Sequence, residues 1–181
     1  MEKKTMDELN RISANEFKEM EKHPFCLILD NIRSMNNVGS VFRTADAFVA
    51  SHVYLCGITA TPPHRDIEKT ALGATESVNW SYHKQTAEVV KQLQLAGWKV
   101  YAVEQAKSSQ MLHHFEPSPT SRYAFILGNE VFGVEEEVLE LVDGILEIPQ
   151  GGTKHSLNIS VTTGIICWDF VSKIQAFSNS L

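Results

Sequence analysis

Hydrophobic residues follow two kinds of pattern along the chain. Compact apolar-rich runs, which suit strands covered on both faces, occur at residues 25–29, 52–56, 98–103 and 123–127. Apolar positions at helical spacing occur over residues 38–49, 86–96 and 156–174. Shorter patterns predict helical turns at 67–72 and 135–141, an edge strand at 78–82 and a last strand at 145–148. This alternation predicts an α/β fold with a mostly parallel sheet and helices on both faces, although residues 105–121 fit either a loop or a weak helix.

The amino-terminal residues form a more polar segment than those that follow. Residues 7–21 predict a polar helix with sparse apolar contacts, and His23 and Pro24 end it. These apolar contacts are Leu9, Ile12, Phe17 and Met20. We expect residues 1–24 to be a helical arm lying over a single domain at residues 25–181, a size typical of one domain.

The last predicted helix is apolar around most of its circumference. The residues that cover it are Ile159, Val161, Ile165, Ile166, Cys167, Trp168, Phe170 and Val171. Such a helix needs cover on more than one side, and a chain of 181 residues has little mass to provide it. We therefore expect a homodimer.

The net charge, the cysteine content and the hydrophobic runs limit which cellular compartment and which binding partners are expected. A net charge of −6 excludes a broad basic coat for non-specific nucleic-acid or membrane binding, but not a small basic site. The cysteines Cys26, Cys56 and Cys167 are far apart and odd in number, so neither a disulfide framework nor a zinc ribbon is expected. Without a signal segment or an apolar run of membrane-spanning length, the chain is expected to be soluble and cytoplasmic.

Common catalytic motifs are missing from the sequence. It contains no P-loop, no dinucleotide-binding G-x-G-x-x-G after a strand and no G-x-S-x-G elbow. The adjacent His113 and His114 point to different faces, which favours exposed histidines over a metal site. We expect no metal.

Three segments fit neither a core nor an ordinary surface. In residues 37–45 (NVGSVFRTA), Gly39 and Ser40 in the first helical turn would leave backbone N–H groups free for an anion, and Arg43 could bind the same anion. The alternative is a capped helix with a surface arginine. In residues 127–134 (LGNEVFGV), Asn129 and Glu130 follow a buried strand and would face the ligand crevice. The alternative there is an Asx turn with Glu130 solvated.

The third segment is residues 148–161 (IPQGGTKHSLNISV). Gly151 and Gly152 allow close approach of a ligand to the backbone, and Ser156 or Asn158 is placed to cap the last helix or to bind beside it. Lys154 and its neighbour His155 make this loop locally basic, which suits either phosphate binding or simple solvation.

Together and in this order, the three segments resemble the motifs of the SpoU (TrmH-like) branch of the SPOUT RNA methyltransferases. Residues 69–74 (KTALGA) also match a segment common in that family, so the similarity extends over nearly all of residues 25–170. The resemblance implies an α/β fold with a C-terminal deep trefoil knot, an S-adenosylmethionine (AdoMet) cofactor bound in the knot, and methyl transfer to a ribose 2′-hydroxyl of tRNA or rRNA, with no DNA or membrane partner. Residues 1–24 are too short for the separate RNA-binding domain of many relatives.

The resemblance also implies a set of site residues. The residues that correspond to the catalytic set are Asn37, Arg43, Glu130, Ser156 and Asn158. The residues that correspond to the cofactor-binding set are Leu127, Gly128, Asn129, Ile148, Pro149, Gly152, Ser156 and Leu157.

Two groups are candidates for accepting the hydroxyl proton in this reaction. Family proposals assign it to the arginine, here Arg43, yet a guanidinium with a pKa above ~12 is a poor base at neutral pH. A substrate phosphate bound to Arg43 could take or relay the proton instead. Two other readings of the whole chain are a non-catalytic RNA- or cofactor-binding protein of this fold and an enzyme that methylates a small molecule.

Overall fold

The computed structural model of the protein describes residue 3, residues 12–153 and residues 156–178, with side chains up to residue 175. The described residues contain one seven-stranded sheet of order β3-β2-β1-β6-β4-β7-β5 in which every strand pair is parallel. The strands are β1 (Phe25–Asp30), β2 (Val53–Cys56), β3 (Trp80–His83), β4 (Trp98–Val103), β5 (Gln110–Met111), β6 (Arg122–Leu127) and β7 (Gly144–Glu147). The predicted parallel sheet is confirmed, and β3 is an edge strand as expected.

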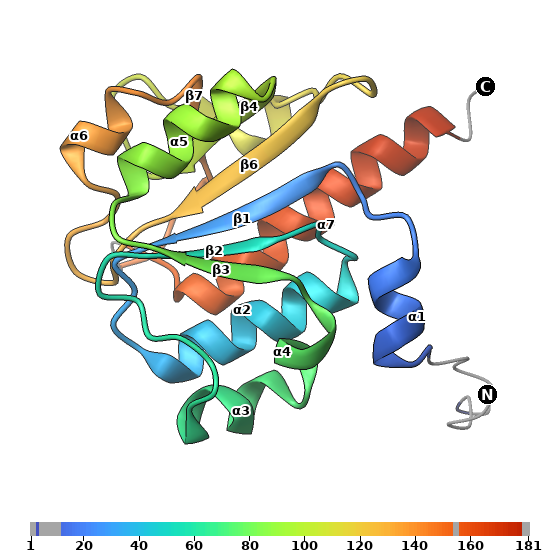
Figure 1. The fold of residues 1–181 in the computed structure, drawn as a ribbon. Coiled ribbons are helices and arrows are strands. Elements are labelled where there is room, and N and C mark those ends of the chain that lie inside the picture. Colours follow the sequence, from blue (N-terminus) through green and yellow to red (C-terminus); the bar gives the residue numbers. More distant parts are fainter. Residues whose placement is uncertain (1–2, 4–11, 154–155, 179–181) are drawn as a thin grey trace.

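Helices cover both faces of this sheet, as predicted (Figure 1). One face carries α1 (Ala14–Glu19), α2 (Met35–Ala47), α3 (Arg65–Ala71), α4 (Ala74–Ser77) and α7 (Ile159–Ser178). The other face carries α5 (Thr86–Leu95) and α6 (Glu136–Leu139). A short 3-10 helix, η2 (Leu112–His114), follows β5, so the unassigned residues 105–121 contain a two-residue strand and one short 3-10 helix within a loop.

The centre of the sheet is the most deeply buried part of the protein. All six residues of β1 are buried, which explains why its first five residues are apolar without alternation before Asp30. In register, β1 and β6 pair from Phe25 with Tyr123 to Leu29 with Leu127. The two strands therefore end at the same level, and the loops that follow them lie side by side.

The described amino-terminal helix begins at Ala14 and ends at Glu19, within the predicted range of residues 7–21. Ser13 is its N-cap, with its hydroxyl accepting from Glu16 N–H and its own N–H donating to the Glu16 carboxylate, whereas residues 7–11 of the prediction lie outside the described residues. Of its predicted apolar contacts, Phe17 is buried in the core, whereas Ile12 and Met20 are exposed. Leu9 lies outside the described residues.

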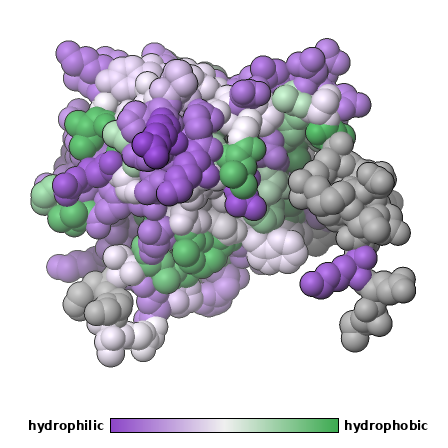
Figure 2. All heavy atoms as spheres, turned by 90° about the horizontal axis from the view of Figure 1, so that it is seen from below, coloured by the Kyte–Doolittle hydropathy of each residue, from purple (hydrophilic) through white to green (hydrophobic). Residues whose placement is uncertain are grey.

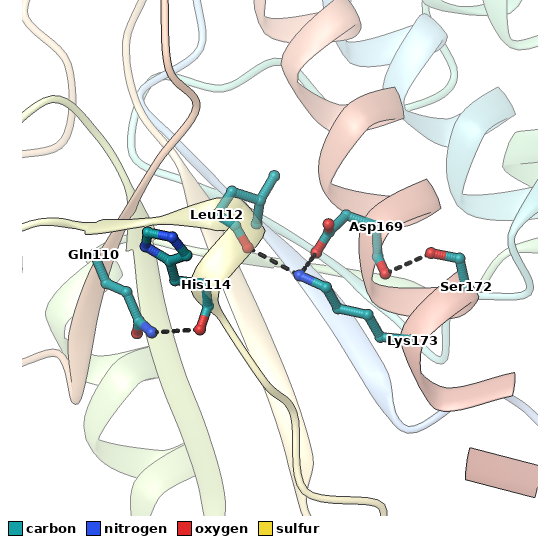
Figure 3. Close-up of polar contacts among 6 residues, drawn as sticks. All are labelled: Gln110, Leu112, His114, Asp169, Ser172 and Lys173. Carbon is teal, nitrogen blue, oxygen red and sulfur yellow. Dashed lines mark hydrogen bonds and ion pairs between the residues drawn. The ribbon is translucent and has the colours of Figure 1, made fainter. Parts of the chain in front are cut away.

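The carboxy-terminal helix α7 begins at Ile159, three residues after the predicted start, because Asn158 caps it. Near its other end, Lys173 Nζ donates to the carbonyl oxygen of Leu112 at 2.9 Å and pairs with Asp169 at 2.8 Å (Figure 3). This contact ties α7 to η2. No helix among the described residues is long and apolar enough to cross a membrane.

Part of α7 remains uncovered within the single chain. Val161 and Trp168 lie seven residues apart on it and are 50% and 65% exposed. The face of the molecule in Figure 2 carries several separate hydrophobic patches among hydrophilic residues. The predicted helix with apolar residues on nearly all sides therefore keeps part of its apolar surface at the solvent.

Candidate active site

A pocket of about 650 Å³ lies at the carboxyl end of the sheet. The segments that follow β4, β6 and β7 line it together with the start of α7, and this is the edge where open parallel sheets hold ligands. Eight predicted site residues line it: Leu127, Gly128, Asn129, Glu130, Ile148, Ser156, Leu157 and Asn158. Four others are not among its lining residues: Asn37, Arg43, Pro149 and Gly152.

Asn129 shapes the turn that follows β6. Its side-chain oxygen accepts from the N–H groups of Val131 at 2.9 Å and Phe132 at 3.1 Å, and its Nδ2 donates to the Asn31 carbonyl at 2.7 Å. The Asn129 and Gly133 backbones also exchange two hydrogen bonds of 2.9 Å. The Asx turn that the sequence left as an alternative is thus present, and it fixes the loop to the end of β1.

Glu130 is exposed, yet it is held by three hydrogen bonds rather than simply solvated. Its carboxylate accepts from Arg33 N–H, from Ser34 N–H and from Asn37 Nδ2, each at 3.0 Å. Burial raises the pKa of Glu130, but the hydrogen bonds from Arg33, Asn37 and Ser34 more than offset this, so the pKa lies below its usual value. Glu130 is therefore a carboxylate near neutral pH.

Asn37 extends this network to the third segment. While its Nδ2 donates to Glu130, its Oδ1 accepts from Asn158 Nδ2 at 3.3 Å. Asn158 Oδ1 in turn accepts from Ser160 N–H at 2.8 Å and caps α7. One continuous set of hydrogen bonds therefore joins the three segments that the sequence singled out.

The structure explains the need for glycine at one position near the pocket but not at two others. A Cβ on Gly128 would lie 2.2 Å from Val134 N and 2.3 Å from Gly133 C, so this glycine is required by the loop's own backbone. Added Cβ atoms on Gly151 and Gly152 would meet nothing within 4 Å among the described residues. Close ligand approach remains a prediction for Gly151 and Gly152, and Lys154 and His155 lie outside the described residues.

The prediction of a free anion-binding turn at Gly39 and Ser40 is wrong. Ser34 caps α2 by accepting from Asn37 N–H, so the helix begins at Met35 and both residues lie beyond its first turn. A Cβ on Gly39 would lie 2.1 Å from Thr70 Oγ1 and 2.2 Å from the Ile67 carbonyl oxygen. Gly39 thus permits the close packing of α2 on α3.

Arg43 lies on the exposed side of α2, as its place off the apolar stripe predicted. It is not among the residues that line the pocket, and its guanidinium makes no hydrogen bond or ion pair within the described residues. Within one chain, the predicted catalytic arginine is therefore outside the pocket that most of the predicted cofactor residues line.

Several pocket residues were not predicted. Glu104 and Gln105 follow β4, and Glu104 Oε2 accepts from Val134 N–H at 3.1 Å. Their position directly after a predicted strand was the available signal, since parallel strands end at the ligand edge. Val131 and Phe132 also line the pocket although their apolar type suggested no role. No group of three or more potential metal ligands occurs within the described part of the chain.

The fold and the site together define an open α/β protein with three linked polar segments and a pocket at the carboxyl edge of its sheet. The profile of the SpoU rRNA methylase family matches residues 24–168, and the chain belongs to this family. This result agrees with the motif resemblance found in residues 37–45, 127–134 and 148–161.

Similar proteins include two curated methyltransferases. The 23S rRNA (guanosine-2′-O-)-methyltransferase RlmB of Neisseria meningitidis is 29% identical over 154 residues, which is 82% of this chain and 58% of that protein. The tRNA (guanosine(18)-2′-O)-methyltransferase of Thermus thermophilus is 27% identical over 165 residues, which is 90% of this chain and 81% of that protein. The chain thus spans little more than half of the first relative.

Among solved structures, an rRNA methyltransferase from Sinorhizobium meliloti with AdoMet bound is similar, with a TM-score of 0.75. It is 25% identical, and the match covers 84% of this chain and 58% of that chain.

Proposed function

We propose that this protein is an AdoMet-dependent RNA methyltransferase acting on a ribose 2′-hydroxyl of tRNA or rRNA. The observation that carries the proposal is the hydrogen-bonded chain from Asn158 through Asn37 to Glu130 at the pocket. Family membership and the activities named for its relatives support the same reaction.

The pocket fits AdoMet in size and in charge. Its volume of about 650 Å³ is typical of small-molecule sites. The charged residues that line it are Glu104, Glu130 and Glu136, without a lysine or arginine among the described lining residues. An acidic lining favours the cationic sulfonium and ammonium groups of this donor. Leu127, Gly128, Ile148 and Leu157 would hold it.

When bound, AdoMet supplies an electrophilic methyl group: the new bond forms to the ribose oxygen as the sulfonium–carbon bond breaks, leaving a neutral thioether, and the hydroxyl proton passes to a base. Glu130 fixes the segment before α2 through Arg33 N–H and Ser34 N–H, and Asn37 joins it to the cap of α7. Arg43 would bind the substrate phosphate and position the hydroxyl, while the proton passes either to that phosphate or to Arg43 in its neutral guanidine form. Ser156 would contact the phosphate or the cofactor.

We also propose a homodimer in the cytoplasm with a knotted C-terminal region. The exposed Val161 and Trp168 on α7 support the dimer, because a partner would cover them. Free, buried Cys26, Cys56 and Cys167 suit a reducing compartment. The family resemblance supports the knot. We also propose that residues 1–24 form an arm and that residues 25–181 form the methyltransferase domain.

Transfer of labelled methyl groups to RNA tests the activity. The protein, labelled AdoMet and unmodified total tRNA or rRNA should give label that survives as 2′-O-methylnucleotides after nuclease digestion. Calorimetric binding of S-adenosylhomocysteine without transfer to any RNA would instead indicate a non-catalytic binding protein. Label found in a metabolite extract alone would indicate a small-molecule methyltransferase.

A further inference from the structure

Phe132 is a large aromatic residue displayed at the pocket without cover. It lines the pocket, and 85% of its surface is exposed. Its neighbour Val131 is 64% exposed. An exposed apolar patch beside a polar site is typical of a surface that contacts another molecule.

The turn around Phe132 is fixed rather than loose. The Asn129 side chain accepts from the Phe132 N–H, and Asn129 and Gly133 close the turn with paired backbone hydrogen bonds. Gly133 has φ +71°, a conformation that suits glycine. The fold therefore holds the backbone that carries the ring in a defined place, which lowers the entropic cost of ordering the loop on binding.

Among the described residues, the ring of Phe132 also has no aromatic or cationic neighbour. Every other phenylalanine whose side chain is described contacts another ring or a cation: Phe17, Phe25, Phe42, Phe48, Phe115, Phe125 and Phe170. Those phenylalanines have partners within the described chain. Of the phenylalanines whose side chains are described, only Phe132 lacks such a contact, so its ring faces are available to an external partner.

The charges around the pocket indicate which part of an RNA nucleotide could lie at this ring. Glu104, Glu130 and Glu136 line the same pocket and disfavour a phosphate there. The backbone N–H of Arg33 donates to the Glu130 carboxylate, and the exposed Arg43 follows Asn37 on α2. A nucleotide with its ribose at Glu130 and its phosphate bound by these arginines, outside the acidic lining, would leave its uncharged base for Phe132.

We propose that Phe132 stacks on the base of the nucleotide that is methylated, or on its immediate neighbour, and is a positioning residue for the reaction. This inference rests on the proposed function. Single-stranded RNA bases stack on aromatic side chains, and each such contact is sequence-tolerant because every base has a π-face.

Kinetics of Phe132→Ala and Phe132→Trp test the proposal. From the strength of base–aromatic stacking, Phe132→Ala should raise KM for unmodified total RNA about 5- to 100-fold, and Phe132→Trp should restore it. The Kd for S-adenosylhomocysteine should stay within about twofold of wild type, because stacking acts on RNA. Leu95→Ala is the matched control, since Leu95 is 90% exposed and is not among the pocket's lining residues.

A second measurement uses an oligoribonucleotide that spans the mapped methylation site, with or without its target base and each neighbouring base in turn. Removing the stacked base should raise the wild-type KM about as much as Phe132→Ala does, and should raise the KM of the variant little further. If base removal and Phe132→Ala have fully additive effects on KM at all three positions, the proposal is overturned.

Other outcomes separate the alternatives. Weaker S-adenosylhomocysteine binding by Phe132→Ala would make the ring a cover for the cofactor, and a changed sedimentation coefficient would make it a protein interface; either would overturn the stacking role. Wild-type protein that methylates no RNA defeats the proposed function itself. Active wild type with an equally active Phe132→Ala defeats this inference alone.

Discussion

Asn37 Nδ2 donates to Glu130 Oε1 over 3.0 Å, although the two residues are 93 positions apart. The contact fixes the beginning of α2 to the loop after β6, and Asn158 joins the same network through Asn37 Oδ1. The site geometry therefore depends on a carboxylate with both oxygens in use.

Glu130→Gln should destabilise the protein. The amide keeps one acceptor oxygen and places an NH₂ group where the other oxygen accepts a backbone N–H from Arg33 or Ser34. A loss of about 1–2 kcal/mol in the free energy of unfolding is expected for hydrogen bonds to a partly exposed charged group. Urea denaturation measures it, and Glu21→Gln, on an exposed residue, is the control.

The pH dependence of this difference follows from the lowered pKa of Glu130. Since the folded pKa lies below the unfolded one, the stabilisation is complete above the unfolded value of about 4.3 and is lost as pH falls through the folded value. Wild type and Glu130→Gln should therefore converge in stability in acid. A gap between them that stays constant down to pH 2 would contradict the charged hydrogen-bond network.

Gly39→Ala should lower stability although alanine favours helices. Alanine in a helix interior gains about 0.5–1 kcal/mol over glycine, but here its Cβ would meet the Ile67 carbonyl oxygen at 2.2 Å. Overpacking of this kind costs about 1–3 kcal/mol, so the free energy of unfolding should decrease overall. Thermal denaturation should show this as a lower midpoint. The control is Gly151→Ala, which should be near neutral because its Cβ would meet nothing within 4 Å in the part of the chain that the structure describes.

Sequence patterns predicted most strands well because a parallel strand buried on both faces, such as β1, is a continuous apolar run, here over its first five residues. They located the pocket through loops at strand ends, and Leu127, Gly128 and Ile148 line it. Helix starts were less predictable because several polar residues before residue 38 could serve as the cap, and Ser34 caps α2 so that it begins at Met35, before the predicted range of residues 38–49. Phe132 escaped notice because exposure is decided by the fold, not by residue type.

Arg43→Lys should abolish most methyl transfer while leaving the fold intact. Arg43 is exposed, so the free energy of unfolding should stay within about 0.5 kcal/mol of wild type. Loss of the forked guanidinium removes bidentate phosphate contact, which lysine cannot reproduce. The assay is labelled-methyl transfer at saturating AdoMet, with Arg65→Lys as the exposed-arginine control. Wild-type turnover by Arg43→Lys would rule out both roles proposed for this residue.

Trp168→Lys should shift the proposed dimer toward the monomer. Trp168 is 65% exposed on α7. Among the described residues, its one ring contact is an edge contact with Phe48, with 6.5 Å between the ring centroids. A charge in an apolar interface is costly to desolvate. Sedimentation velocity at micromolar concentration should show a species near 20.3 kDa for the variant and a larger one for wild type. A monomeric wild type would refute the dimer.

His52 should titrate well below the usual range for histidine. Its Nε2 lies 2.9 Å from Ser81 Oγ, which lies 2.9 Å from His83 Nε2, so the serine bridges the two rings beside β2 and β3. Burial, with a smaller contribution from His83, lowers the pKa of His52 to about 4. NMR titration should therefore give His52 a midpoint near that value.

The lowered pKa of His52 also predicts how stability changes with pH. An unfolded histidine binds its proton near pH 6.5, so between that pH and about 4 the unfolded chain holds more protons than the folded one. Stability should fall as pH drops through this window, and less steeply in His52→Asn than in wild type. His113→Asn, at an exposed position, should keep the wild-type slope. A wild-type midpoint near 6.5 for His52 would show that its ring is solvated rather than buried against β3.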